Sequence, residues 1–306
     1  MIKYALSRIL QTIPVIFVVS IIVFLILHLV PGDPIKLLAS PRAKKATIQR
    51  LRERWGLDEP LHVQYGQWIW NLLHGDMGES IRHHVPVSQL IGTRYLNTLR
   101  LTSASMFLAV LFGVPMGIAA SLYRNSIIDT VIMGFAVAGF SIPPFWLGLI
   151  LLLVFSVNLD LLPAGGGASM QHLILPAVSL GIATMALIAR MMRSTMLEVL
   201  GSDYIRTARS KGLSEKWVIL VHSLKNALIP IVTIIGVQFG VLMAGAVVTE
   251  VVFTWPGIGW LMVDSIKNRD FPIIRSALLI TSVTFIMVNL VVDLLYGFLD
   301  PRITYD

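Results

Sequence analysis

The most distinctive chemistry in the sequence lies in a short basic segment, Gly201–Gly212, which reads GSDYIRTARSKG. Ser202 and Asp203 suit the start of a helix, because a hydroxyl can cap free backbone N–H groups and a carboxylate favours the positive end of the helix dipole. Lys211 and Gly212 suit its end. The predicted helix is far too short to cross a membrane. The residues on one of its sides are Tyr204, Ile205 and Ala208.

A short amphipathic helix with this charge can bind in two ways. It can rest on anionic lipid, or it can fit into a cleft of a partner protein. The residues alone favour lipid, because basic amphipathic helices commonly bind membranes. Both interpretations place the segment at a membrane surface.

The other titratable side chains offer little catalytic or metal chemistry. Glu250 and Asp293 lie near the ends of apolar stretches, where a carboxylate can reach water, so structural roles are at least as well supported as functional ones. Four histidines fit no metal-ligand spacing and are expected to be solvated; they are His62, His74, His83 and His84. The sequence has no cysteine and no Gly-x-x-x-x-Gly-Lys-Ser/Thr phosphate loop. We therefore expect no catalytic residue, metal or cofactor in this chain.

Composition identifies the surroundings of these residues. The 306 residues are 56% hydrophobic and 13% charged, and the mean hydropathy is +0.78. A soluble domain carries about a quarter charged residues, so these values indicate an integral membrane protein. The formal net charge of +7 does not require nucleic acid. In membrane proteins, excess Lys and Arg lie mostly in cytoplasmic loops.

Six apolar stretches are long enough to cross a membrane, which takes about 20 helical residues. They lie near Ile9–Val30, Leu99–Leu122, Val131–Val157, Leu173–Met192, Ile229–Phe253 and Ala277–Leu299. The first is too long for a signal peptide and no small-x-small cleavage site follows it, so we interpret it as a retained anchor. The third is expected to break at Ser141–Pro144. Gly236, Gly240 and Ala244, like Gly113 and Gly117, are small residues that suit either a seam between subunits or packing within one chain.

Charge in the short loops predicts the orientation. A basic cluster lies between the fourth and fifth spans, whereas the loop 158–172 has no Lys or Arg. This pattern places both termini in the cytoplasm. The long basic segment 31–97 would lie outside, which is tolerated because long segments translocate largely regardless of charge. We thus divide the chain into an anchor (1–30), a periplasmic helical segment (31–97), a five-span core (98–299) and a cytoplasmic tail (300–306).

Two regions are expected on the outer side of this core. Helical spacing predicts one helix over Ile48–Trp55 and another over Leu61–Leu72, either packed over the outer mouth or forming a surface cap without a transport role. The loop between the last two spans contains Trp255, Pro256, Gly257 and Gly259. It is either an outer gate or an interfacial aromatic anchor.

Motifs along nearly the whole chain resemble the binding-protein-dependent permeases of ABC importers, specifically the first permease subunit of dipeptide, oligopeptide, nickel and glutathione systems. The most specific is Arg206-Thr-Ala-Arg-Ser-Lys-Gly212 followed by Asn226-Ala-Leu-Ile-Pro230, which resembles the family's ATPase-docking motif. The generic motif begins Glu-Ala-Ala, so its acidic contact is not carried over to this chain. Weaker matches include Pro31-Gly-Asp-Pro34, Leu57-Asp-Glu-Pro-Leu61, Gly75-Asp-Met-Gly78, Ser141-Ile-Pro143, Trp255-Pro-Gly-Ile-Gly259 and Asp300-Pro-Arg302.

The resemblance implies an all-α type I ABC importer permease with six transmembrane helices and a helical outer insert after the first span. It implies a bacterial inner membrane, a second homologous permease subunit, two ABC ATPase subunits that bind the ATP, and a periplasmic or lipid-anchored solute-binding protein. The coupling helix would be 202–212, moved as a rigid lever by the ATPases. Its docking residues would be Asp203, Tyr204, Arg206, Thr207, Ala208, Arg209, Lys211 and Gly212.

The expected cargo is a small peptide, with glutathione or a nickel chelate as alternatives. A passive channel is the main alternative function, since its spans would look similar. A secondary transporter is less well supported, because the sequence shows neither a chain of buried acids nor an inverted repeat of broken helices.

Overall fold

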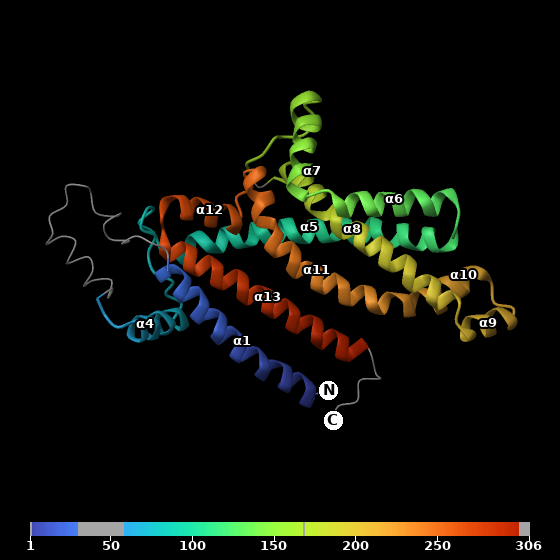
Figure 1. Ribbon diagram of the computed structural model, residues 1–306, viewed down its shortest axis with the longest axis horizontal. Helices are drawn as coiled ribbons and strands as arrows, with labels where there is room; N and C mark the ends of the chain where they lie inside the picture. The colour runs from blue at the N-terminus through green and yellow to red at the C-terminus, as the bar shows by residue number, and fades with distance from the viewer. Residues whose placement is uncertain (1, 30–57, 168, 300–306) are drawn as a thin grey trace.

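The computed structural model describes residues 2–29, 58–167 and 169–299, and these ranges are almost entirely helical or in turns (Figure 1). Their one strand-like pairing is an isolated antiparallel bridge between Glu79 and Pro86. The helices are α1 (Ile2–Leu29), α4 (Leu61–Leu73), α5 (Val87–Leu122), α6 (Ile127–Ser141), α7 (Pro144–Leu151), the π-helical η1 (Leu152–Asn158), α8 (Met170–Leu200), α9 (Asp203–Ser210), α10 (Glu215–Trp217), the π-helical η2 (Val218–Ser223), α11 (Leu224–Val252), α12 (Ile258–Asn268) and α13 (Phe271–Leu299). The helix expected over Ile48–Trp55 and the tail 300–306 lie outside the described residues.

Five helices in the described ranges are long and apolar enough to cross a membrane: α1, α5, α8, the continuous run α10–η2–α11, and α13. The pair formed by α6 and α7–η1 also passes when it is taken together, although the two parts are bent by 102°. Counted as one broken span, this pair gives the six spans predicted from the sequence. The all-helical fold class is therefore confirmed.

The bend between α6 and α7 lies where the two prolines predict it. Ile142 adopts an extended backbone (φ −83°, ψ 122°), which is the conformation that a following proline favours. Pro144 begins α7 at a position where its missing N–H costs nothing. The break expected at Ser141–Pro144 is thus confirmed. Figure 1 shows α7 projecting away from the other helices.

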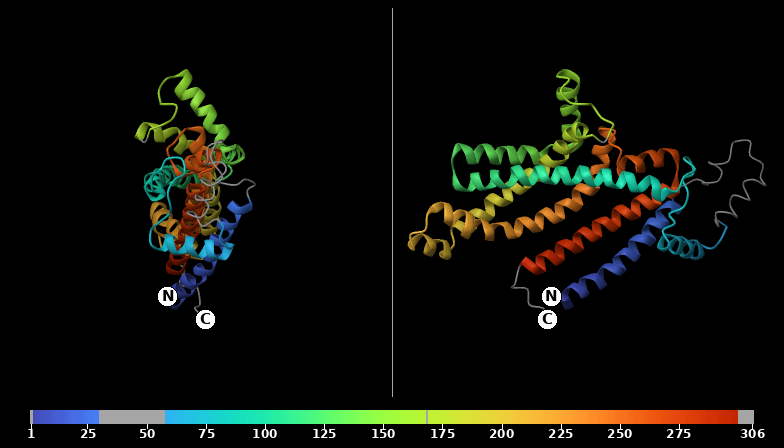
Figure 2. Two further views of the ribbon diagram at one scale, coloured as in Figure 1. Left: turned by 90° about the vertical axis from the view of Figure 1, so that its left-hand side faces the viewer. Right: turned by 180° about the vertical axis from the view of Figure 1, so that it is seen from behind.

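Figures 1 and 2 show how the helices are arranged. The helices α1 and α13 run side by side, and they approach α4 and α12 at one end of the molecule, called here the α12 end. The opposite end carries α9, α10 and the turn between α5 and α6, and is called the α9 end. Among the described helices, α5 and α8 share the most extensive interface, and α11 packs against both.

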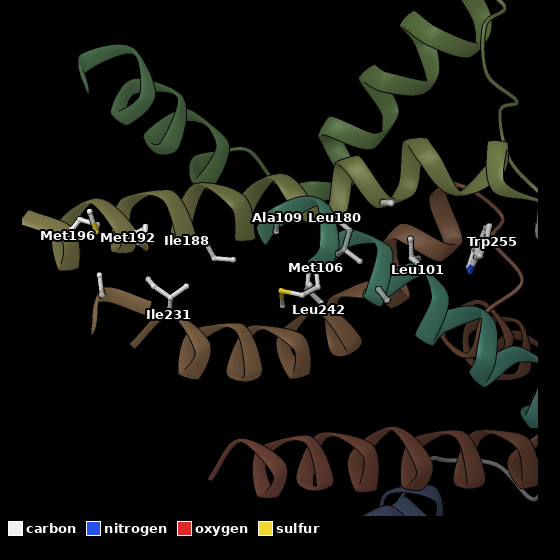
Figure 3. Close-up of a cluster of buried hydrophobic side chains, with 13 residues drawn as sticks. Leu101, Met106, Ala109, Leu180, Ile188, Met192, Met196, Ile231, Leu242 and Trp255 are labelled. Atoms are coloured by element: carbon white, nitrogen blue, oxygen red, sulfur yellow. The ribbon is translucent and has the colours of Figure 1, made fainter. Parts of the chain in front are cut away.

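A single apolar cluster joins these three central helices (Figure 3). It combines side chains from α5, α8 and α11 with the indole of Trp255, and all of its core members are almost fully buried. The labelled members are Leu101, Met106, Ala109, Leu180, Ile188, Met192, Met196, Ile231, Leu242 and Trp255. The flexible methionines fill the space between helices that cross at an angle.

Small residues allow these helices to approach closely within one chain. A Cβ on Gly117 of α5 would lie 2.5 Å from the carbonyl oxygen of Ala189 and 2.5 Å from Cβ of Met192, both on α8. In the same way, Gly236 and Gly240 of α11 face side chains of α13. Packing within one chain therefore explains Gly117, Gly236 and Gly240, and a seam between subunits is not needed to explain them.

Replacing Gly117 with alanine is expected to destabilise the protein by about 1–3 kcal/mol, because the added methyl must push α5 away from α8. The thermal midpoint of the detergent-purified protein measures the effect. Gly134→Ala on α6 is the matched control, since nothing lies within 4 Å of a Cβ there. Equal midpoints for the two variants would contradict the close packing.

Aromatic and polar contacts attach the segment 58–86 to the spans. Trp68 of α4 is buried, stacks on Phe24 of α1 at 6.0 Å and lies 4.7 Å beneath the guanidinium of Arg275 of α13. The buried carboxylate of Asp270 accepts a hydrogen bond of 2.6 Å from the hydroxyl of Ser80. The segment 58–86 is therefore packed on the ends of α1 and α13 that lie at the α12 end.

Candidate functional site: the short helix α9 and the loop before α12

A short helix is present at the predicted position as α9, and its ends match the sequence signals with one exception. Lys211 and Gly212 terminate the helix, and Gly212 has a φ of +77°, which favours glycine. Ser202 occupies the N-cap position, but its hydroxyl donates 2.6 Å to the carbonyl of Val199 instead of capping α9. The expected side-chain cap is therefore wrong, and the hydroxyl instead bonds to the last turn of α8.

One face of α9 packs against the chain itself. Ile205 is 0% exposed and Ala208 is 7% exposed, and both contact Val218 of η2. Leu213 and Val199 pack around this small cluster. The cluster holds α9 against the start of the fifth span.

Polar contacts strengthen the same attachment. The guanidinium of Arg209 makes two hydrogen bonds to the carboxylate of Glu215, at 2.6 Å and 3.1 Å. This hydrogen bonding raises the pKa of Arg209 above its already high ordinary value, so the side chain keeps its charge. The hydroxyl of Tyr204 accepts a hydrogen bond of 2.8 Å from the amide of Asn226 in α11. Tyr204, expected on the apolar face, is thus exposed and bound through its hydroxyl.

The opposite face of α9 is free of the chain. Asp203 and Arg206 have side chains that are 95% and 78% exposed, with a loose contact of 3.5 Å between them. Thr207 and Lys211 are also exposed. A helix fixed on one face and open on the other can transmit a push from a partner to the spans on either side.

A buried ion pair ties α6 to α8 near the α9 end. The guanidinium of Arg193 binds the carboxylate of Asp129 with two hydrogen bonds, at 2.6 Å and 2.7 Å. Asp129 also accepts from the backbone N–H of Asn125, which fixes the turn before α6. This bidentate geometry joins the first turn of α6 to α8.

At the α12 end, the loop that precedes α12 is organised by a buried carboxylate. Glu250 is 0% exposed and accepts hydrogen bonds from the hydroxyl of Thr98 at 2.6 Å and from the backbone N–H of Trp260 at 3.0 Å. The Thr98 oxygen in turn accepts from the backbone N–H of Ile258 at 2.9 Å. The expectation that Glu250 reaches water from a span end is therefore wrong, because the loop folds over it.

The glycines of this loop make room for the carboxylate. A Cβ on Gly257 would overlap both oxygens of Glu250, and a Cβ on Gly259 would lie 2.5 Å from Cα of Val247. The loop backbone therefore approaches α11 as closely as glycine alone permits. Sequence reasoning noted these glycines but not their acidic partner, although an acid a few residues before a tight glycine turn is a usable signal.

Trp255 belongs to the core and not to a membrane interface. Its indole is 1% exposed, and its Nε1 donates 3.0 Å to the carbonyl of Asn97 in α5. The amide of Asn97 donates 2.9 Å to the carbonyl of Pro256. Trp255 is thus not an interfacial anchor, and the structure brings all four loop residues named from the sequence together around α5 and Glu250.

Metal chemistry has no support in the described ranges. They contain no group of three or more His, Asp or Glu side chains arranged to hold a metal ion. His74 bonds to the carbonyl of Trp70 within its own helix, and His83 and His84 are exposed.

A bundle of membrane-crossing helices with a short helix held between its fourth and fifth crossings is the architecture of a membrane transport permease. The chain belongs to the family described as binding-protein-dependent transport system inner membrane component, which matches residues 113–305. The N-terminal model of the same kind of component matches residues 1–102. The chain is thus a permease subunit of an ABC importer.

Relatives match along the whole chain. The glutathione transport system permease protein GsiC of Salmonella choleraesuis (strain SC-B67) is 50% identical over 305 residues, which cover 100% of both chains. GsiC of Escherichia coli (strain K12) is 48% identical over the same length.

Solved structures share the fold. A MetNI methionine ABC transporter in an inward-facing conformation aligns with a TM-score of 0.60 at 18% identity, covering 69% of this chain and 97% of that chain. An amino acid ABC transporter crystallised with histidines aligns with a TM-score of 0.56 at 16% identity, covering 68% and 94%.

Proposed function

We propose that the chain forms, with a second homologous permease subunit, the pathway by which a small peptide crosses a bacterial inner membrane. Among small peptides, glutathione is the first to test. The observation that carries this choice is the 50% identity to a glutathione permease along the entire chain. In this proposal an external binding protein, periplasmic or lipid-anchored, delivers the peptide, and two ABC ATPase subunits bind and hydrolyse ATP.

The α9 end is proposed to face the cytoplasm. The first residues of α1 and the last described residues of α13 lie away from the α12 end, on the side toward α9, so both termini would be cytoplasmic (Figures 1 and 2). The exposed basic residues Arg206, Lys211 and Lys216 lie there. This distribution follows the preference of short cytoplasmic loops for Lys and Arg. The division into anchor, periplasmic segment, core and tail follows from the same orientation.

The exposed face of α9 is proposed to dock into a cleft of an ATPase subunit. Two observations support this proposal. The side chains on that face are exposed, and on the opposite face Ile205, Ala208 and Arg209 contact residues of the same chain. Closure of the ATPase dimer would move α9 together with η2 and the ends of α8 and α11. The bundle would then exchange inward for outward access.

The loop Trp255–Gly259 is proposed to act as the outer gate. The loop lies at the α12 end, where α5, α11 and α12 meet. The buried carboxylate of Glu250 fixes its backbone, so a shift of α11 against α5 would move the loop as one piece.

The substrate proposal is tested by uptake of labelled glutathione into cells that lack their own glutathione importers. The cells would carry this chain together with the permease, ATPase and binding-protein genes encoded beside it. Uptake that stops when the ATPase loses its catalytic glutamate is the expected result. Uptake of other dipeptides without uptake of glutathione would overturn the substrate, and uptake without ATP hydrolysis would indicate a channel.

A further inference from the structure

Among the described residues, Arg190 in the span α8 has no carboxylate partner. The side chain of Arg190 is exposed, and within the described residues it takes part in no hydrogen bond or ion pair. The guanidinium makes a cation–π contact with an aromatic ring, because its Cζ lies 5.5 Å from the ring centroid of Phe140 in α6. An ionised side chain in this situation marks a functional position in a membrane protein.

The position of Phe140 along α6 shows in which direction the Arg190 side chain extends. The ion pair between Asp129 and Arg193 marks the first turn of α6, near the α9 end. Phe140 lies three turns farther along the helix, about 16 Å toward the α12 end at 1.5 Å per residue. Arg190 precedes Arg193 by three residues on α8, about 4.5 Å along the helix axis, and its guanidinium extends from there toward Phe140 and the α12 end.

The Arg190 side chain does not extend toward the α9 end of the molecule. Side chains on a helix lean toward its N-terminus, which for α8 is the end farther from α9. Arg190 leans this way to reach Phe140. A snorkelling arginine would turn instead toward the α9 end, where the membrane surface is closer.

Polar residues continue from Arg190 along the same face of α8. Ser194 and Glu198 follow at four-residue spacing, and both are exposed. Residues spaced in this way share one side of a helix. A polar, exposed stripe along the last turns of an apolar span is costly against lipid but natural against water.

We propose that this face of α8 lines the translocation pathway and that Arg190 binds a carboxylate of the peptide in transit. A guanidinium offers two parallel N–H donors that match a carboxylate, and the aromatic face of Phe140 holds its plane. The inference rests on the proposed function. It applies to any peptide with a free C-terminal carboxylate, and glutathione carries two carboxylates.

The first test uses thiol accessibility and does not depend on the substrate. The chain has no cysteine of its own, so a single Leu187→Cys, one turn before Arg190, reports on this face alone. The assembled complex would be treated with an anionic sulfonatoethyl and a cationic trimethylammonioethyl methanethiosulfonate, and the mass of this chain measured. Both reagents are expected to react, and the anionic one is expected to react several-fold more slowly once Arg190→Gln is added.

Val18→Cys, on the exposed face of α1, is the control and is expected to remain unmodified. Absence of reaction at Leu187→Cys would overturn the inference, because the face would then lie against lipid or inside a subunit seam. An unchanged anionic-to-cationic rate ratio in Arg190→Gln would overturn the electrostatic role of the arginine.

The second test measures peptide uptake in proteoliposomes. Arg190→Gln is expected to lower uptake about tenfold, the loss of one charge-assisted hydrogen-bonded pair, while Arg190→Lys retains an intermediate rate. ATPase stimulation by the loaded binding protein is expected to persist. If the wild-type complex imports peptide and the Arg190→Gln complex imports it at the same rate, this inference is overturned and the proposed function stands. Failure of the wild-type complex to import any peptide would overturn the proposed function instead.

Discussion

Replacing Ala208 with leucine is expected to reduce transport to background while the chain stays inserted in the membrane. Ala208 is buried against Val218 of η2, where there is no room for three more carbon atoms. Overpacking of this kind costs about 1–3 kcal/mol and is relieved by moving the surface element, which here is α9. A displaced α9 presents its docking face at a wrong angle, so ATP hydrolysis no longer moves the spans.

Two milder variants show whether volume at Ala208 is the cause. Ala208→Ser adds one atom and is expected to transport well. Gly212→Ala meets no neighbour within 4 Å, so its cost comes only from the φ of +77° and amounts to about 1 kcal/mol. Its effect on transport is expected to lie between the two Ala208 variants.

The measurement is uptake compared with ATPase activity in proteoliposomes. In Ala208→Leu we expect the ATPase to lose its stimulation by the binding protein, together with the loss of uptake. Normal uptake by Ala208→Leu with the ATPase subunits still bound would show that α9 is not the lever.

Replacing Glu250 with alanine is the second change with a large expected effect. The substitution leaves the backbone N–H of Trp260 without an acceptor, and it leaves the hydroxyl of Thr98 with only its long hydrogen bond of 3.4 Å to the carbonyl of Arg94. Each such group costs about 1–3 kcal/mol, so the loop before α12 is expected to leave its position and transport to be lost. The thermal midpoint should fall markedly in parallel with uptake.

Glu250→Gln separates shape from charge. The amide keeps one oxygen acceptor but turns an NH₂ group toward a donor, so an intermediate loss of stability is expected. Asp293→Asn is the matched control, because this half-exposed acid pairs with Arg8 at 3.3 Å, and exposed pairs contribute at most about 1 kcal/mol. Equal midpoints for Glu250→Ala and Asp293→Asn would contradict a structural role for the buried acid.

The spans, the proline break and α9 could be predicted because each depends on local chemistry. Apolar length sets the crossings, and Pro143 and Pro144 exclude a continuous helix. The ends of α9 follow from Asp203 and Gly212, whose preferences act within one turn. No distant contact is needed for any of these features.

The burial of Glu250 and Trp255 could not be predicted in the same way. Both depend on how the loop before α12 folds back onto α5, which brings Thr98 beside Glu250 across more than 150 positions of sequence. The Asp129–Arg193 pair is likewise a product of helix packing. Sequence spacing places a residue on a helix, but the neighbouring helix decides whether it meets water, lipid or protein.

Site-directed cross-linking between α9 and the ATPase tests the central claim most directly. Because the chain contains no cysteine, a photoreactive thiol reagent can be attached to a single cysteine at Arg206 or Thr207, on the exposed face of α9. In the assembled complex during ATP hydrolysis, the account predicts an adduct with an ATPase subunit at both positions. Adducts with lipid alone, in a complex that is importing its peptide, would contradict it.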